Sequence, residues 1–146
     1  MSRRPDYGHL LTMLPHQFPL RVLDEVKDYS PGKFLVAGCS PLPLKIYFGN
    51  TDTIPPTLLI EGLAQACVIL TQLETAPLEE DEVPLLGAIK AKLLMPISWQ
   101  EPIIYKVEPV RILSKKAIFT GTLYRSDGTT AVSAELSVAV AATSNS

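Results

Sequence analysis

Residues 55–70 read PPTLLIEGLAQACVIL, and this stretch decides the fold. On a helix, its apolar side chains cover nearly every face, which is typical of a helix buried at the centre of a domain. The two leading prolines suit a helix entry, because proline is tolerated in the first helical turn. The sequence therefore predicts a core helix that ends near residue 73 or 74.

Glu61 and Gln65 break this apolar pattern. They stand four residues apart, so their side chains leave the same face of the helix. A carboxylate buried without a partner is costly enough that it usually gains a partner or takes up a proton. Glu61 is therefore the first candidate for a catalytic residue. The pattern also fits a carboxylate with a structural role, or a helix face that opens to solvent.

The composition indicates one compact domain over residues 1–146. Hydrophobic residues make up 47% of the chain and charged residues 19%, a balance that excludes a disordered chain. The formal net charge is −2 and the pI about 5.7. This charge gives no basic footprint for nucleic acid, so no nucleic-acid partner is expected.

Cys39 and Cys67 lack the spacing of a metal site, and no metal or other cofactor is expected. Without a disulfide framework, the sequence favours a reducing, cytoplasmic compartment, with Cys67 as a buried apolar residue. No signal peptide is expected, because no apolar stretch follows the basic N-terminus. The core helix is expected to be too short for a membrane span, and it carries Glu61.

The segments around the core helix predict strands. A short helix over residues 7–14 comes first, and two strands over residues 20–29 and 33–39 follow it. Residues 41–56 show no regular pattern, and a long irregular segment in a compact domain is often a functional loop. Strands rich in Val, Ile, Leu, Tyr or Thr are predicted over residues 85–95, 101–113, 116–125 and 130–141.

This order of elements predicts an α+β fold, an antiparallel sheet wrapped around one long central helix. Asp127-Gly128 is a hairpin signal between the last two strands. Such a sheet has edges that need covering or pairing, so dimerisation is expected.

Several segments, in chain order, carry a likeness to a known family. They are residues 14–26 (LPHQFPLRVLDEV), the core helix, residues 87–96 (GAIKAKLLMP) and residues 121–138. Together they resemble the β-hydroxyacyl-acyl carrier protein dehydratases, which have the hot-dog fold. The resemblance implies a single hot-dog domain and places Glu61 at the position of that family's catalytic acid.

The resemblance also implies a reaction, the elimination of water from a 3-hydroxyacyl thioester in fatty-acid or polyketide-type synthesis. In that family a histidine removes the α-proton and a carboxylic acid helps the hydroxyl to leave. The two residues come from different subunits, so a homodimer or a trimer of dimers is implied. The implied partner is an acyl carrier protein or a coenzyme A thioester.

The family histidine is missing from this sequence. Counting back fourteen residues from Glu61, as the family pattern implies, gives Tyr47, within Tyr47-Phe48-Gly49-Asn50. The chain contains only His9 and His16, both near the N-terminus. A positioned acid or base contributes about 10²–10⁴-fold to the rate of a reaction. A tyrosine, with a pKa of about 10 in model peptides, is a poor base at neutral pH.

Four hypotheses follow from this substitution. The first is a divergent dehydratase or isomerase in which Tyr47, Asp52 or a flexing His16 acts as the base. The second is a subunit that offers Glu61 to a histidine from an active paralogue in a heteromer. The third is a hot-dog thioesterase that uses Glu61 without a histidine. The fourth is a protein without catalytic activity that binds an acyl chain or a carrier protein.

Further residues are assigned through the resemblance. Asn50, Pro55 and Gln65 are expected to bind substrate, although Asn50 also fits a simple turn. Lys90 and Lys92 are expected to contact an acidic carrier protein, although either also fits an ordinary outward-facing strand lysine. Apolar bulk that could extend a binding surface or an interface is found at Leu94, Met95 and Trp99.

Overall fold

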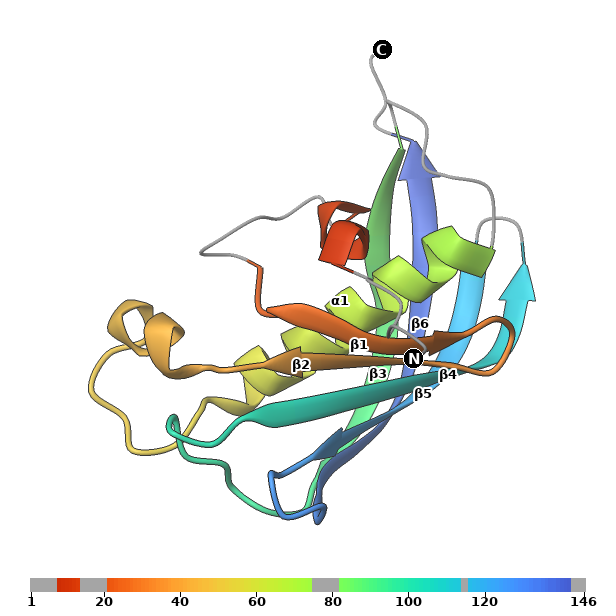
Figure 1. Ribbon diagram of the computed structural model, residues 1–146. Coiled ribbons are helices and arrows are strands. Elements are labelled where there is room, and N and C mark those ends of the chain that lie inside the picture. The colour runs from red at the N-terminus through yellow and green to blue at the C-terminus, as the bar shows by residue number, and fades with distance from the viewer. Residues whose placement is uncertain (1–7, 14–20, 75–81, 114–115, 143–146) are drawn as a thin grey trace, which may run out of the picture.

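The structure of the chain is a computed structural model, which describes residues 8–13, 21–74, 82–113 and 116–142 (Figure 1). Six strands form one antiparallel sheet in the order β1-β2-β4-β5-β6-β3. The strands are β1 (Glu25–Ser30), β2 (Phe34–Cys39), β3 (Glu82–Leu93), β4 (Ile103–Leu113), β5 (Lys116–Tyr124) and β6 (Thr130–Ala142). The predicted α+β architecture is confirmed.

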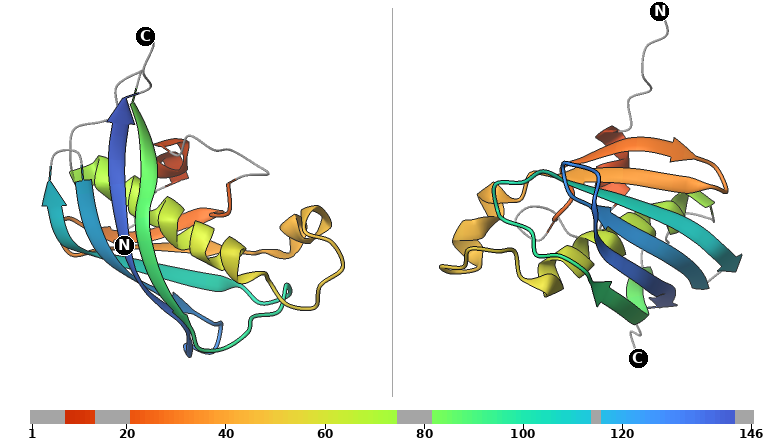
Figure 2. Two further views of the ribbon diagram at one scale, coloured as in Figure 1. Left: turned by 180° about the vertical axis from the view of Figure 1, so that it is seen from behind. Right: turned by 90° about the horizontal axis from the view of Figure 1, so that it is seen from below.

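The helix α1 (Pro56–Glu74) lies along the inner face of the curved sheet (Figure 2). Strand β5 shows why the sheet has an inner and an outer face. Its burial alternates residue by residue, with Phe119 and Leu123 buried and Ile118 and Thr120 exposed. The buried set packs toward α1 and forms the core, whereas the exposed set makes up the face opposite the helix.

Gly62 allows α1 to approach β4 closely. A Cβ atom at this position would lie only 2.4 Å from the Cζ and Oη atoms of Tyr105, which is fully buried. Any larger residue would therefore push the helix away from the sheet. This contact fixes the helix face that turns inward, and with it the direction in which the neighbouring Glu61 points.

The first predicted strand is too long at its N-terminal end. Val22 and Leu23 are buried but lie before β1, and their backbone N–H groups point at the side chain of Gln65. Because a helix side chain takes these donors, residues 22 and 23 make no strand ladder. Leu20 lies outside the described residues.

Two short 3₁₀ helices complete the fold. The predicted N-terminal helix is η1 (Gly8–Met13), and the segment expected to be irregular contains η2 (Leu42–Tyr47). Gly49 follows η2 with a φ of +79°, a backbone conformation that favours glycine. The segment then enters α1 through Pro55.

At 19 residues, α1 is long enough and apolar enough to cross a membrane by length and composition alone. The expectation that it is too short is therefore wrong. Most of the helix is buried against the sheet, as in the core helix of a globular domain. The apolar composition of α1 is therefore explained by its burial in the core.

Candidate active site

The carboxylate of Glu61 is exposed, contrary to the expectation of a buried acid. Gly62 and Leu63, which follow it on α1, are fully covered by the sheet. The helix therefore has one narrow solvent-exposed stripe. The apolar residues that surround Glu61 in the sequence give no sign of this stripe. The alternative that this helix face opens to solvent is the correct one.

Gln65 is buried and holds Glu61 in place. Its Oε1 accepts hydrogen bonds from the backbone N–H groups of Val22 (2.8 Å) and Leu23 (3.4 Å). Its Nε2 donates to Oε1 of Glu61 at 3.3 Å. Because both amide ends are engaged, the Gln65 side chain has one orientation, and it fixes one oxygen of the Glu61 carboxylate. Within the described residues, this hydrogen bond engages one of the two carboxylate oxygens of Glu61.

Tyr47, Asn50 and Pro55 all lie on the connection between β2 and α1. This connection leads into the N-terminal end of the helix that carries Glu61 (Figure 1). Tyr47 ends η2 and is 55% exposed. Asn50 is exposed and Pro55 half-buried. A substrate-binding role for Asn50, Pro55 and Gln65 remains a prediction.

Trp99 anchors this connection. Its indole Nε1–H donates to Thr51 Oγ1 at 3.2 Å, and its ring lies 6.0 Å from the Phe48 ring, centroid to centroid. Trp99 is fully buried, so the prediction that it extends a binding surface is wrong. No local sequence signal marks this role, because Trp99 stands 48 residues from Thr51. The segment next to Glu61 is therefore held by the core.

The cysteines do not add a nucleophile to the site. Burial, with a contribution from Asp24, raises the pKa of the Cys39 thiol to about 12. Burial alone raises the pKa of the Cys67 thiol even further. Both thiols stay protonated at neutral pH and act as small apolar groups, as predicted for Cys67.

The described ranges contain no cluster of three or more His, Cys, Asp or Glu residues that could hold a metal ion. His9 is the one histidine within these ranges, and it lies on η1 instead of the connection that carries Tyr47. His16 lies outside the described residues. The described part of the connection between β2 and α1 contains no histidine, and a catalytic role for Glu61 remains a prediction.

Lys90 and Lys92 do not belong to this site. They lie on the outer face of β3, where they stand opposite Glu135 and Ser133 of β6. The structure thus separates the predicted site residues into two groups. One group lies on α1 or on the connection that leads into it, and the other lies on the outer face of β3.

Known proteins with similar sequences are dehydratases. The chain is 33% identical over 111 residues to the coronafacic acid dehydratase of Pseudomonas savastanoi pv. glycinea, covering 73% of this chain and 67% of that one. It is 31% identical over 126 residues to the 3-hydroxyacyl-[acyl-carrier-protein] dehydratase FabZ of Histophilus somni, covering 83% of each chain. No model of a known protein family matches the chain.

Solved structures share the fold. The dehydratase heterocomplex ApeI:P from Xenorhabdus doucetiae aligns with a TM-score of 0.76 at 19% identity, over 94% of this chain and 91% of that one. A thioesterase from Haemophilus influenzae aligns with a TM-score of 0.59 at 13% identity, over 82% and 78%. The sheet around one helix is therefore a hot-dog fold, and the chain belongs to the family of FabZ-like 3-hydroxyacyl-[acyl-carrier-protein] dehydratases.

Proposed function

We propose that this chain is a dehydratase subunit that uses Glu61 as the acid and takes its base from a second chain. The observation that carries the proposal is the held carboxylate of Glu61, exposed on α1 and hydrogen-bonded by a buried Gln65. An exposed side chain gains little from holding one geometry, so the contact with a buried partner distinguishes this carboxylate from an ordinary surface one. A fixed and accessible acid is suited to proton transfer.

In the proposed reaction, a base removes the α-proton of a 3-hydroxyacyl thioester. Protonated Glu61 gives its proton to the leaving hydroxyl, which departs as water. The electron pair of the broken C–H bond forms the new double bond, and the product is a 2-enoyl thioester. Since Oε1 of Glu61 accepts from Gln65, the other oxygen is the one that carries the proton to the hydroxyl.

The need for a second chain follows from Tyr47. By a count of fourteen residues back from Glu61, it takes the position where the resemblance implies the family histidine, and His9 is far from that position along the chain, on η1. The ApeI:P dehydratase, whose fold aligns with this chain at a TM-score of 0.76, is a heterocomplex. This similarity supports a heteromer here as well. A partner that supplies the histidine would complete a site with Glu61, and the half-site at Tyr47 would stay inactive.

Two surfaces of the chain are suited to such a partner. Within the described residues, β3 is paired only with β6, so the other edge of its twelve residues is open to pairing. On the connection between β2 and α1, η2 exposes apolar side chains, with Leu42 51% and Ile46 82% exposed. Leu93 at the end of β3 is 49% exposed. Association with a second chain would cover these exposed apolar groups and pair the open edge of β3.

The test is turnover of 3-hydroxyacyl thioesters, both coenzyme A and carrier-protein forms, measured by mass spectrometry. The chain alone should give little product, and a mixture with a histidine-containing paralogue should give loss of water. Glu61→Gln should lower this turnover about 10²–10⁴-fold. Glu108→Gln, which changes an exposed carboxylate on the outer face, is the matched control and should have no effect. Full activity of the chain alone would disprove the need for a partner.

A thioesterase is the second candidate function, favoured by the thioesterase fold of similar shape and by a site without a described histidine. Glu61 would then activate water or attack the thioester carbonyl. The same assay separates the two, because a thioesterase releases free acid and free thiol instead of water. If neither product forms with any partner, both catalytic proposals fail.

A further inference from the structure

The hairpin between β4 and β5 exposes aliphatic side chains at its tip, residues 110–118. Val110 is 64%, Leu113 50% and Ile118 38% exposed. Val110 stands at an irregularity in the β4–β5 register, between Pro109 and Arg111. A bulge of this kind leaves the extra residue outside the strand ladder, and here that residue is on the surface. Solvent-facing positions of a strand are usually polar, so three exposed aliphatic side chains in one hairpin call for a partner.

Basic side chains stand beside these aliphatic ones across the hairpin. Arg111 lies directly opposite Ile118, and Leu113 lies opposite Lys116. Cross-strand partners share one face of a sheet, and all four residues are exposed, so they lie together on the face opposite α1. Residues 109–126 contain no acidic residue, although the chain has a net charge of −2. The tip is therefore both apolar and positively charged.

The other face of the same hairpin is fixed in the core. Ala117 is buried between the two exposed residues that flank it on β5, and Ile112 packs against the core cluster. Because strand side chains alternate between faces, the aliphatic side chain of Leu113 cannot turn inward without displacing these contacts. The tip is thus a rigid projection whose apolar groups stay exposed in the single chain.

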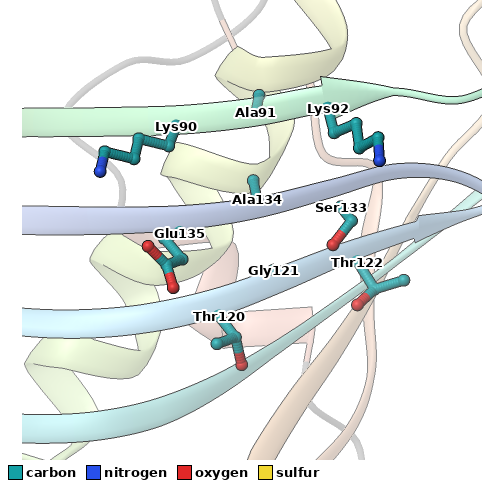
Figure 3. Close-up of a pocket in the computed structure, with 9 residues that line it drawn as sticks. All are labelled: Lys90, Ala91, Lys92, Thr120, Gly121, Thr122, Ser133, Ala134 and Glu135. Carbon is teal, nitrogen blue, oxygen red and sulfur yellow. The ribbon is translucent and has the colours of Figure 1, made fainter.

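The acidic side chains of this face lie farther from the tip. Glu108 and Glu135 both pair with Thr120, two residues from Ile118 and away from the turn. Figure 3 shows Glu135 beside Thr120 in the polar part of the face. At about 3.3 Å per residue, that row lies roughly 7 Å behind Ile118. Opposite Ile118 itself, β6 contributes only the small Ser137.

We infer that the tip of the β4–β5 hairpin docks on the surface of an anionic lipid bilayer. The three aliphatic side chains would enter the boundary between headgroups and acyl chains, while Arg111 and Lys116 would pair with lipid phosphates. Residues 110–118 contain no aromatic residue. The tip therefore lacks the stacking groups that bind nucleic-acid bases and the aromatic anchors typical of protein interfaces. Hydrocarbon, in contrast, accepts aliphatic groups without a matching shape.

This contact is peripheral, because α1 stays in the core, and it holds whether or not the chain is catalytic. Figure 1 shows η2 and the hairpin tip at opposite ends of the molecule, so η2 provides controls with exposed apolar residues. Binding is measured by co-sedimentation with vesicles of equal parts phosphatidylcholine and phosphatidylglycerol. The natural chain should bind these vesicles at low salt, bind less as salt rises, and bind vesicles of phosphatidylcholine alone weakly.

Charge variants test the pairing with phosphates. Arg111→Gln/Lys116→Gln should weaken binding to the anionic vesicles about tenfold or more at low salt. Lys27→Gln/Lys33→Gln removes two charges from the exposed β1–β2 hairpin and should change binding less than about twofold. Equal binding by these two double variants, or tighter binding of the natural chain to duplex DNA than to the vesicles, would overturn the inference.

A tryptophan at the tip tests insertion directly. In Leu113→Trp, fluorescence should be quenched when the phosphatidylcholine of the mixed vesicles is brominated, a signal that misfolding alone does not give in the absence of lipid contact. Ile46→Trp, on η2, should stay unquenched, and the buried Trp99 gives both variants the same background. Equal quenching in the two variants, or no binding of the natural chain to anionic vesicles at low salt, would show that the tip is not a membrane contact.

Discussion

Gln65 connects the segment before β1 to the carboxylate of Glu61 through a single side chain. Its Oε1 takes the N–H of Val22 at 2.8 Å, and its Nε2 gives a hydrogen bond to Glu61 at 3.3 Å. The orientation of the amide is fixed by these partners, because only its oxygen can accept from a backbone N–H. The position of the candidate acid is therefore tied to how the chain enters the sheet.

Replacing Gln65 separates its structural role from its role at the site. Gln65→Leu leaves two buried N–H groups without an acceptor, and we expect unfolding free energy to fall by about 1–3 kcal/mol for each. Gln65→Glu keeps the acceptor but replaces the donor to Glu61 with a second carboxylate. In Gln65→Leu, both the unfolding free energy measured in urea and the turnover rate should fall. In Gln65→Glu, the turnover rate should fall more than the unfolding free energy does. Equal losses of both properties in the two variants would contradict the positioning role.

Gly62→Ala should destabilise the protein although alanine is the better helix former. In open space this change would stabilise a helix by about 1 kcal/mol. Here the added methyl group would meet the Tyr105 ring at 2.4 Å, and overpacking of this kind costs about 1–3 kcal/mol. Thermal and urea unfolding would measure the loss. In a chain that already carries Tyr105→Leu, Gly62→Ala should lower the unfolding free energy by less. If the two substitutions lower it by the sum of their separate effects, the Tyr105 ring is not the cause of the loss.

The end of α1 is tied to the β1–β2 hairpin by Glu74, and this tie makes stability sensitive to alkaline pH. Glu74 Oε1 accepts from Tyr29 Oη at 2.8 Å and from the Gly32 N–H at 2.7 Å. Partial burial, together with the hydrogen bond and negative charge of Glu74, raises the pKa of Tyr29 to about 12. A raised folded-state pKa means that the stabilisation is complete below about pH 10 and is lost as the pH rises through 12.

Unfolding free energy should therefore fall between pH 10 and 12 in the natural chain, and this fall should be smaller in Tyr29→Phe. Tyr124→Phe removes a hydroxyl from β5 and is the matched control. Denaturant titrations across this pH range provide the measurement. An identical pH profile for the natural chain and Tyr29→Phe would rule out this contribution.

Much of the fold was predictable because apolar periodicity reports burial. The core helix was predicted to its last residues, and the four strands from β3 to β6 were found within a few residues of their ends. The exposure of Glu61 was one of several alternatives that the sequence left open, since an open stripe one residue wide leaves an otherwise apolar pattern unchanged. It depends on Gly62, which turns the neighbouring helix face onto Tyr105.

The rest of the site depends on contacts between distant residues. Gln65 was marked by its spacing from Glu61, but its bonds to Val22 and Leu23 span more than forty residues. Those bonds also explain why β1 begins later than predicted. The hydrogen bond from Trp99 to Thr51 likewise joins two loops that are distant in the sequence. The local sequence of either loop does not predict this contact.

Ile46 tests the proposed association with a partner chain. It is 82% exposed on η2, beside the segment that leads to Glu61, and a solvent-facing isoleucine has no role in the stability of a single chain. Ile46→Glu should therefore leave unfolding of the single chain unchanged but weaken association about tenfold or more, since a charge would be buried without a partner. Val110→Glu is the control, because Val110 is 64% exposed on β4, away from η2. Analytical ultracentrifugation of the chain, alone and with a histidine-containing paralogue, gives the readout. If both variants associate as the natural chain does, η2 is not part of the interface, and the partner must approach Glu61 from the edge of β3 alone.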